Sequence, residues 1–189
     1  MTVFTAYNAL LKCASLDIKT VLDVGSGLGK HTKFFKSEDK IVTSVDILDR
    51  GYNIVGDYLT TKVKPHDLVW AAHILEHQPN VHTFLKKCRT DCSKYICITV
   101  PPAKPEIVGG HLTTWNAGLV MYNLVLAGFD CSNAKILQYG YNISVIAEVG
   151  NFVLPDLNYD NGDIEKISNW LPSGYNYQGF NGNITNLNW

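Results

Sequence analysis

Glycine recurs at every second position in a short stretch near the beginning of the chain. Gly25, Gly27 and Gly29 directly follow a short apolar run of Val21, Leu22 and Val24, which is typical of a buried strand, and precede a polar segment that can form a helix. A glycine turn lets the backbone approach a ligand closely, and the first N–H groups of the next helix have no partner within it. The spacing predicts a cradle for the polar atoms of a nucleotide, although a turn that binds nothing also needs glycine.

Two carboxylates follow the glycines at the ends of short β-branched runs. Asp46 ends the run 41–46, about twenty residues beyond the glycine turn, and Asp57 follows the run 53–55. In nucleotide-binding α/β sheets an acidic residue at the first of these places accepts hydrogen bonds from ribose hydroxyls. We therefore expect Asp46 to hold a ribose, and a solvated carboxylate at a strand end is the alternative.

Two histidines are the candidates for acid–base chemistry. His73 follows the apolar run 67–72, and His111 follows a loop over residues 101–110 that is rich in proline and glycine. An imidazole has an ordinary pKa near 6.5, so it can accept a proton from a hydroxyl group close to neutral pH. We expect both histidines to contact a substrate or transfer a proton, and the alternative for each is a hydrogen-bonded structural histidine.

The segment that begins at His73 also spells a metal-binding signature. His73, Glu76 and His77 have the spacing H-x-x-E-H, which in one class of zinc peptidases places two histidines on a metal and a glutamate on the attacking water. That arrangement requires a helix, whereas this segment leaves a strand and reaches Pro79 after a single turn. We therefore expect no metal, assign Glu76 to the beginning of the next helix and His77 to the surface, and keep a zinc hydrolase as the less favoured alternative.

Two of these segments resemble motifs of a known family. The stretch Leu22-Asp23-Val24-Gly25-Ser26-Gly27-Leu28-Gly29 resembles the first motif of class I S-adenosylmethionine-dependent methyltransferases, and residues 73–80 resemble the fourth motif of their small-molecule branch. The resemblance spans residues 1–150. It implies that S-adenosylmethionine is the cofactor and is held by Asp23, Gly25, Ser26, Gly27, Gly29, Asp46, Ile47, Asp57, Tyr58, Ala72 and His73.

The resemblance also implies a reaction. A methyl group on a sulfonium is already activated, so the protein chiefly has to align the donor with the attacking atom for an in-line displacement. The expected acceptor is a small molecule with a hydroxyl group, such as a sugar or another metabolite, and it would enter beside His73, His111 and the loop 101–110. A catalytically inactive binding or assembly module with the same fold is the alternative.

The elements that must position these residues alternate along the chain. The patterns predict strands over 20–24, 41–46, 53–55, 67–72 and 95–100, helices over 7–16, 30–36, 81–92 and 111–127, and a hairpin of strands 134–137 and 141–149. Thr113 is the expected cap of the last helix and Gly128 its expected end. This order predicts an α/β fold, namely a Rossmann-like, mostly parallel sheet with helices on both faces and a C-terminal antiparallel β-hairpin.

Composition limits the alternatives. The 189 residues are 46% hydrophobic and 17% charged, which suits one methyltransferase domain over 1–150 and an Asn- and aromatic-rich extension over 151–189. The net charge of −1, without a clustered basic stripe, argues against a nucleic-acid partner. The chain carries neither a membrane-length apolar run nor a signal peptide, and its five scattered cysteines suit reduced thiols, so we expect a cytoplasmic protein without a membrane partner.

The extension over 151–189 has no pattern of a second core. A short helix is expected over 163–170, and the interleaved aromatic residues favour a surface wrap over the edge of the sheet. A flap over the substrate, or a contact between copies of the chain in a homo-oligomer, is the alternative.

Overall fold

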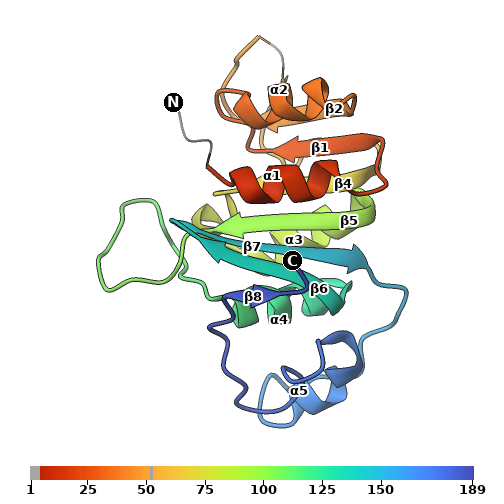
Figure 1. The fold of residues 1–189 in the computed structure, drawn as a ribbon, viewed down its shortest axis with the longest axis vertical. Coiled ribbons are helices and arrows are strands. Elements are labelled where there is room, and N and C mark those ends of the chain that lie inside the picture. The colour runs from red at the N-terminus through yellow and green to blue at the C-terminus, as the bar shows by residue number, and fades with distance from the viewer. Residues whose placement is uncertain (1–4, 52) are drawn as a thin grey trace.

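The computed structural model describes residues 5–51 and 53–189 (Figure 1). One eight-stranded sheet has the order β3-β2-β1-β4-β5-β7-β6-β8. Strands β1 to β5 pair in parallel, whereas β7 pairs antiparallel with β5, and β6 antiparallel with β7 and β8. The predicted mostly parallel sheet with a terminal hairpin is confirmed. The strands are β1 Thr20–Val24, β2 Ile41–Asp46, β3 Ile54–Val55, β4 His66–Ala72, β5 Cys92–Val100, β6 Phe129–Tyr139, β7 Asn142–Val149 and β8 Asn186–Leu187.

Helices cover both faces of the sheet, as the sequence predicts. Helices α1 (Tyr7–Ala14) and α2 (Lys30–Ser37) pack on one face, against side chains such as Trp70. Helices α3 (Val81–Thr90) and α4 (Ala117–Ala127) pack on the other face. Successive strand residues point to opposite faces, so the central strands bury apolar side chains on both sides and read as continuous apolar runs.

The prediction for the beginning of α4 is wrong. Asn116, and not Thr113, caps the helix, because its side-chain oxygen accepts a hydrogen bond from the N–H of Leu119 at 2.8 Å. The Thr113 hydroxyl instead accepts a hydrogen bond from the indole N–H of Trp115 at 2.9 Å. Residues 111–115 are irregular because their backbone groups bond to neighbouring segments. Gly128, with a φ of 99°, ends the helix as predicted.

Two strands begin three or more residues before the predicted position. Strand β5 begins at Cys92 instead of residue 95, and β6 begins at Phe129 instead of residue 134. The pairing of β6 with β7 shifts register between Asp130 and Lys135. Such an irregularity interrupts the alternation of buried and exposed residues, which hides the first half of the strand from a periodicity argument.

The C-terminal segment runs along α4 and returns to the sheet. The expected helix over 163–170 is split into α5 (Asp163–Lys166) and a 3-10 turn, η2 (Ser168–Trp170). Three apolar side chains of the C-terminal segment are buried in the core on the side of α4, namely Ile167, Leu171 and Ile184. The two-residue strand β8, which we did not predict, pairs with β6. The division of the chain at residue 150, and the role of the extension, stay predictions.

The described helices are too short or too polar to span a membrane. Not one of those in residues 5–51 and 53–189 combines the length and the apolar character needed to cross a bilayer.

Candidate functional site

The glycine turn lies where the carboxyl ends of β1 and β2 meet. The N–H groups of Gly25 and Ser26 donate to the carbonyl of Val45 at 2.9 and 3.3 Å. The N–H of Gly27 donates to Oδ2 of Asp46 at 2.7 Å. The two residue types that the sequence singles out, glycine after the first strand and a carboxylate at the end of the second, therefore form one hydrogen-bonded unit.

Two features make glycine necessary at the first position of the turn. Gly25 has a φ of +68°, in the left-handed region that favours glycine. A Cβ atom placed on it would also lie 2.7 Å from Cδ1 of Ile74, which follows β4. The backbone of the turn and the segment after β4 are thus in close contact.

A cavity of about 260 Å³ opens on one side of this turn. Asp46 and Asp57 supply carboxylates to its wall, and Ile47 and Tyr58 supply apolar surface. Asp46 already accepts from the N–H groups of Gly27 and Leu48, the latter at 2.9 Å, and keeps further lone pairs. Hydrogen-bond acceptors beside apolar walls suit a ligand with hydroxyl groups and a flat apolar part.

Tyr58 is held in this wall by its hydroxyl group. The O–H donates to Oδ2 of Asp91 at 2.8 Å, and Lys87 forms an ion pair with the same carboxylate. The ring of Tyr58 packs edge to face on Phe84, with 5.7 Å between the ring centres. Burial, together with nearby Cys88 and Asp91, raises the pKa of Tyr58. The hydroxyl is therefore occupied inside the protein, and what Tyr58 offers the cavity is its ring.

A second cavity, of about 240 Å³, lies on the other side of the turn. Its wall includes Gly25, Ser26, Gly27 and Ala72, all predicted site residues, and also Lys30 and His31. Ser26 is buried, and its Oγ has no hydrogen-bond partner among the described residues. A buried hydroxyl without a partner is costly, so a polar ligand atom in this cavity would satisfy it.

His31 is a site residue that the sequence reasoning missed. Its Nδ1 accepts from the indole N–H of Trp70 at 3.2 Å, and its Nε2 lies 3.0 Å from the carbonyl of Thr5, to which it donates. Burial lowers the pKa of His31, which agrees with this neutral form. The sequence could have indicated His31, because it lies next to Lys30 in the first turn of the helix that follows the glycines.

Asp23 lies beneath the turn, with 1% of its surface exposed. Its Oδ2 accepts a hydrogen bond from the hydroxyl of Thr32 at 2.5 Å. Burial raises the pKa of Asp23 to about 6 against the opposing effect of Thr32, and the charge of Asp46 adds to the increase. Asp23 thus connects β1 to α2 below the two cavities. Gly29, with a φ of +68°, precedes the first residue of α2.

His73 follows β4 with a φ of +55°, a backbone conformation that is uncommon for residues other than glycine. Its Nε2 donates to Oδ1 of Asn142 at 2.9 Å, and its Nδ1 lies 3.3 Å from Oε1 of Glu76. Burial lowers the pKa of His73, but Glu76 and Asn142 outweigh burial, so the pKa is raised. Because both ring nitrogens have these partners, His73 and His77 do not form the metal pair of the zinc-hydrolase alternative.

The prediction for Glu76 is wrong. Glu76 lies in the 3-10 turn η1 (Leu75–His77), and Asn80 caps α3 by accepting from the N–H of Thr83 at 3.0 Å. Glu76 is buried, and its carboxylate lies near the rings of His73 and His77. A carboxylate in the interior between two imidazoles is a feature of the site that sequence spacing alone did not reveal.

The loop over residues 101–110 is tied to η1. The N–H of Leu112 donates to the carbonyl of Glu76 at 2.8 Å, and Nδ1 of His77 donates to the carbonyl of Gly110 at 2.7 Å. These bonds bring His111 to His77, with ring centres 5.0 Å apart and the planes nearly perpendicular. His111 and Tyr141 also line a small cavity of about 60 Å³ under the loop.

The predicted residues therefore gather at one edge of the sheet. The residues that line the two cavities beside the turn are Gly25, Ser26, Gly27, Asp46, Ile47, Asp57, Tyr58 and Ala72, whereas Asp23 and Gly29 line neither, and His111 lines the cavity at the neighbouring loop. His73 lies beside Glu76, with Nδ1 3.3 Å from Oε1. In parallel α/β sheets ligands bind outside the carboxyl ends of the strands, which is where this group lies.

No protein-family model matches the chain, and no curated protein matches it significantly. Solved structures do match. A 1,6-didemethyltoxoflavin-N1-methyltransferase of Burkholderia thailandensis, with bound S-adenosylhomocysteine, has a TM-score of 0.64 and 16% identity over 78% of this chain and 81% of that one. A SAM-dependent methyltransferase from Archaeoglobus fulgidus has a TM-score of 0.64 and 17% identity over 76% and 91%.

A third similar structure is the magnesium protoporphyrin IX methyltransferase from Synechocystis PCC 6803 with bound SAH. Its TM-score is 0.59, with 13% identity over 76% of this chain and 80% of that one. At these identities the likeness concerns the fold. The chain has the Rossmann-like fold of the SAM-dependent methyltransferases, which the sequence resemblance led us to expect.

Proposed function

We propose that the protein is an S-adenosylmethionine-dependent methyltransferase that acts on a small-molecule acceptor. The observation that carries the proposal is the glycine turn, bonded to Asp46 and flanked by a cavity on each side. The fold supports the proposal, because similar structures contain S-adenosylhomocysteine or SAM.

The two cavities suit the two ends of this cofactor. On the nucleoside side, Asp46 and Asp57 accept hydrogen bonds from the ribose and the base, and Ile47 and Tyr58 cover the base. On the amino-acid side, Ser26 has an unpaired buried hydroxyl, and Lys30 supplies a positive charge for a carboxylate. Gly25 lines both cavities, so a ligand that crosses the turn would contact its backbone.

The predicted reaction is an in-line displacement. The cofactor supplies a methyl group on a positive sulfur, so the main task of the protein is to hold the acceptor on the far side of that methyl group. His73 and His111 stay our candidates for contact with the acceptor, and their part in proton transfer stays a prediction. The acceptor would enter beside the loop 101–110.

The proposed acceptor would lie only partly inside the cavity beside the loop 101–110, which is too small to enclose a sugar. The cavity measures about 60 Å³ and is lined by Lys104, His111 and Tyr141 among others. A hydroxyl acceptor, such as a sugar or another metabolite, remains our proposal for the chemical class. The cytoplasm remains the predicted location, and the free, buried state of the five cysteines supports it. A homo-oligomer formed through the extension also stays a prediction.

An acceptor screen tests the reaction. The protein is incubated with S-adenosylmethionine and a panel of sugars and phenols, and the release of S-adenosylhomocysteine is measured. We expect release with at least one acceptor, and less release by Asp46→Ala at a limiting concentration of S-adenosylmethionine. If the protein binds the cofactor but no acceptor increases the release, the inactive binding module replaces the methyltransferase.

A further inference from the structure

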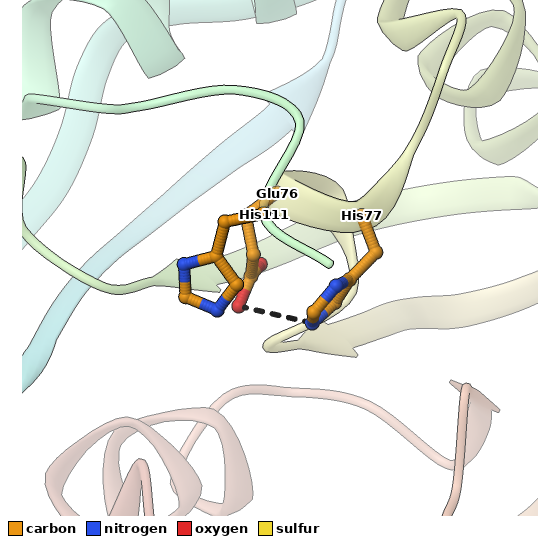
Figure 2. Close-up of side chains that lie close together, drawn as sticks. All are labelled: Glu76, His77 and His111. Atoms are coloured by element: carbon orange, nitrogen blue, oxygen red, sulfur yellow. Dashed lines mark ion pairs between the residues drawn. The ribbon is translucent and has the colours of Figure 1, made fainter. Parts of the chain in front are cut away.

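Three side chains lie close together where His77 lines the nucleoside cavity and His111 lines the proposed acceptor cavity. Glu76 and His77 belong to η1, and His111 comes from the loop after β5. Figure 2 shows the Glu76 carboxylate between the two imidazole rings. One ligand atom from each residue lies within 4.8 Å of the others. We propose that Glu76, His77 and His111 form a binding site for a divalent transition-metal ion.

The burial of the Glu76 carboxylate favours binding of a cation. Its side chain is 1% exposed, Oε2 has no partner among the described residues, and Oε1 has only imidazole nitrogens near it. Nδ1 of His73 and Nε2 of His77 lie 3.3 and 3.8 Å from Oε1. Burying an ionised carboxylate without hydrogen bonds is unfavourable. A metal ion bound to an oxygen would supply the interaction that the protein leaves open.

The hydrogen bond of His77 prepares its other nitrogen for a metal. Nδ1–H donates to the carbonyl of Gly110 at 2.7 Å, so in the neutral ring Nε2 carries the free lone pair. That nitrogen is the one that faces Glu76. Histidines that bind metals usually donate their second N–H to a carbonyl or carboxylate, which fixes the ring. Gly110 is suited to this contact, because a Cβ atom there would lie 3.3 Å from Nδ1.

His111 is brought to the same point by backbone bonds of its own loop. The N–H groups of Leu112 and Thr113 donate to the carbonyl of Glu76 at 2.8 and 3.3 Å. Ligand atoms on one ion, each about 2.1 Å from it, lie about 3.0 to 3.4 Å apart in tetrahedral or octahedral geometry. Small rotations of the His77 and His111 side chains would therefore close the site, because the backbone already holds both residues beside Glu76.

The donor set indicates the kind of ion. Two imidazole nitrogens and one carboxylate oxygen suit Zn²⁺, Co²⁺, Fe²⁺ or Mn²⁺ better than Mg²⁺ or Ca²⁺, which prefer oxygen ligands. Three protein ligands leave at least one coordination position for water or a substrate atom. The site therefore has the composition of an open metal site rather than of a closed structural one.

A bound ion would act on the acceptor, an inference that rests on the proposed function. His111 also lines the proposed acceptor cavity, so an ion bound to His111 would lie near the acceptor. A metal-bound hydroxyl loses its proton to water more easily. Its oxygen then forms the bond to the methyl carbon, and the carbon–sulfur electron pair leaves with sulfur as neutral S-adenosylhomocysteine.

Metal binding is tested without cofactor or acceptor, so that its outcome is independent of methyl transfer. The full chain is freed of metal with a chelator and titrated with Co²⁺, followed by visible absorption, and with Zn²⁺, followed by calorimetry. We expect one equivalent of either ion to bind and an excess of Mg²⁺ not to displace it. His111→Ala and Glu76→Gln should each weaken binding at least about tenfold, because each removes one of three ligands.

His82→Ala is the matched control, since His82 is an exposed histidine on α3 outside the cluster. It should bind Co²⁺ and Zn²⁺ as the unmodified protein does. Circular dichroism checks that each variant is folded, and His111→Ala, a loop variant, decides the question if Glu76→Gln does not fold. The proposal fails if the protein binds neither ion, or if His111→Ala binds as tightly as His82→Ala. A folded protein that binds metal but not S-adenosylmethionine would overturn the proposed function and leave the metal site intact.

Discussion

Replacing Asp23 by Asn should change how the stability of the protein depends on pH. Burial raises the pKa of Asp23 from 3.8 to about 6 in the folded protein. Below the lower value the group is protonated in both states, and above the higher value it is ionised in both. Between them the folded state binds more protons, so the free energy of unfolding falls as the pH rises. The difference of about 2.2 pKa units corresponds to about 3 kcal/mol.

Asn keeps an oxygen that can accept from the Thr32 hydroxyl, but it does not ionise. The free energy of unfolding of Asp23→Asn minus that of the unmodified protein should therefore increase by about 2 kcal/mol between about pH 4 and about pH 7, which is most of the total of about 3 kcal/mol. Urea unfolding at several pH values measures it, and groups that titrate alike in both proteins cancel. Asp17→Asn is the control, because the Asp17 side chain is 99% exposed. A difference for Asp23→Asn that is flat across this range would refute the buried, ionisation-resistant state of Asp23.

Two further substitutions test the turn. Asp46→Ala removes the acceptor for the Gly27 N–H and the proposed ribose partner. We therefore expect the binding free energy of S-adenosylmethionine, measured by calorimetric titration, to weaken by about 1 to 3 kcal/mol. Glu38→Gln changes an exposed carboxylate and should leave the affinity unaltered. Gly25→Ala should lower the free energy of unfolding by about 1 kcal/mol more than Gly27→Ala, since both add a side chain at positive φ but only the first meets Ile74. Equal losses in urea unfolding would show that the contact with Ile74 is unimportant.

The fold was largely predictable because its strands carry strong local signals. Residues 41–46 are a β-branched run that ends at a carboxylate, and β2 has those bounds. The predictions were wrong where contacts between distant parts of the chain determine the local structure. Asn116 rather than Thr113 caps α4 because residues 111–115 bond to other segments, and β8 is a two-residue strand defined only by its pairing with β6.

In the candidate site, too, the local features were predictable and the non-local ones were not. The glycines and Asp46 are recognisable from spacing, and the structure joins them by the bond from the Gly27 N–H. The approach of His111 to His77 depends on a loop that returns to η1 more than thirty residues later, and no local pattern encodes it. Glu76 was misassigned for a related reason, since a carboxylate just before a helix usually serves that helix and its burial is a tertiary property.

A calorimetric titration of the purified full chain with S-adenosylmethionine and S-adenosylhomocysteine, with NAD as a control ligand, decides whether the glycine turn binds the cofactor. The two cavities beside the glycine turn predict that both sulfur compounds bind at one site per chain, in the micromolar range, and that NAD does not bind. Absence of binding of both compounds to a protein shown to be folded would contradict the account, because the turn would then serve only the fold.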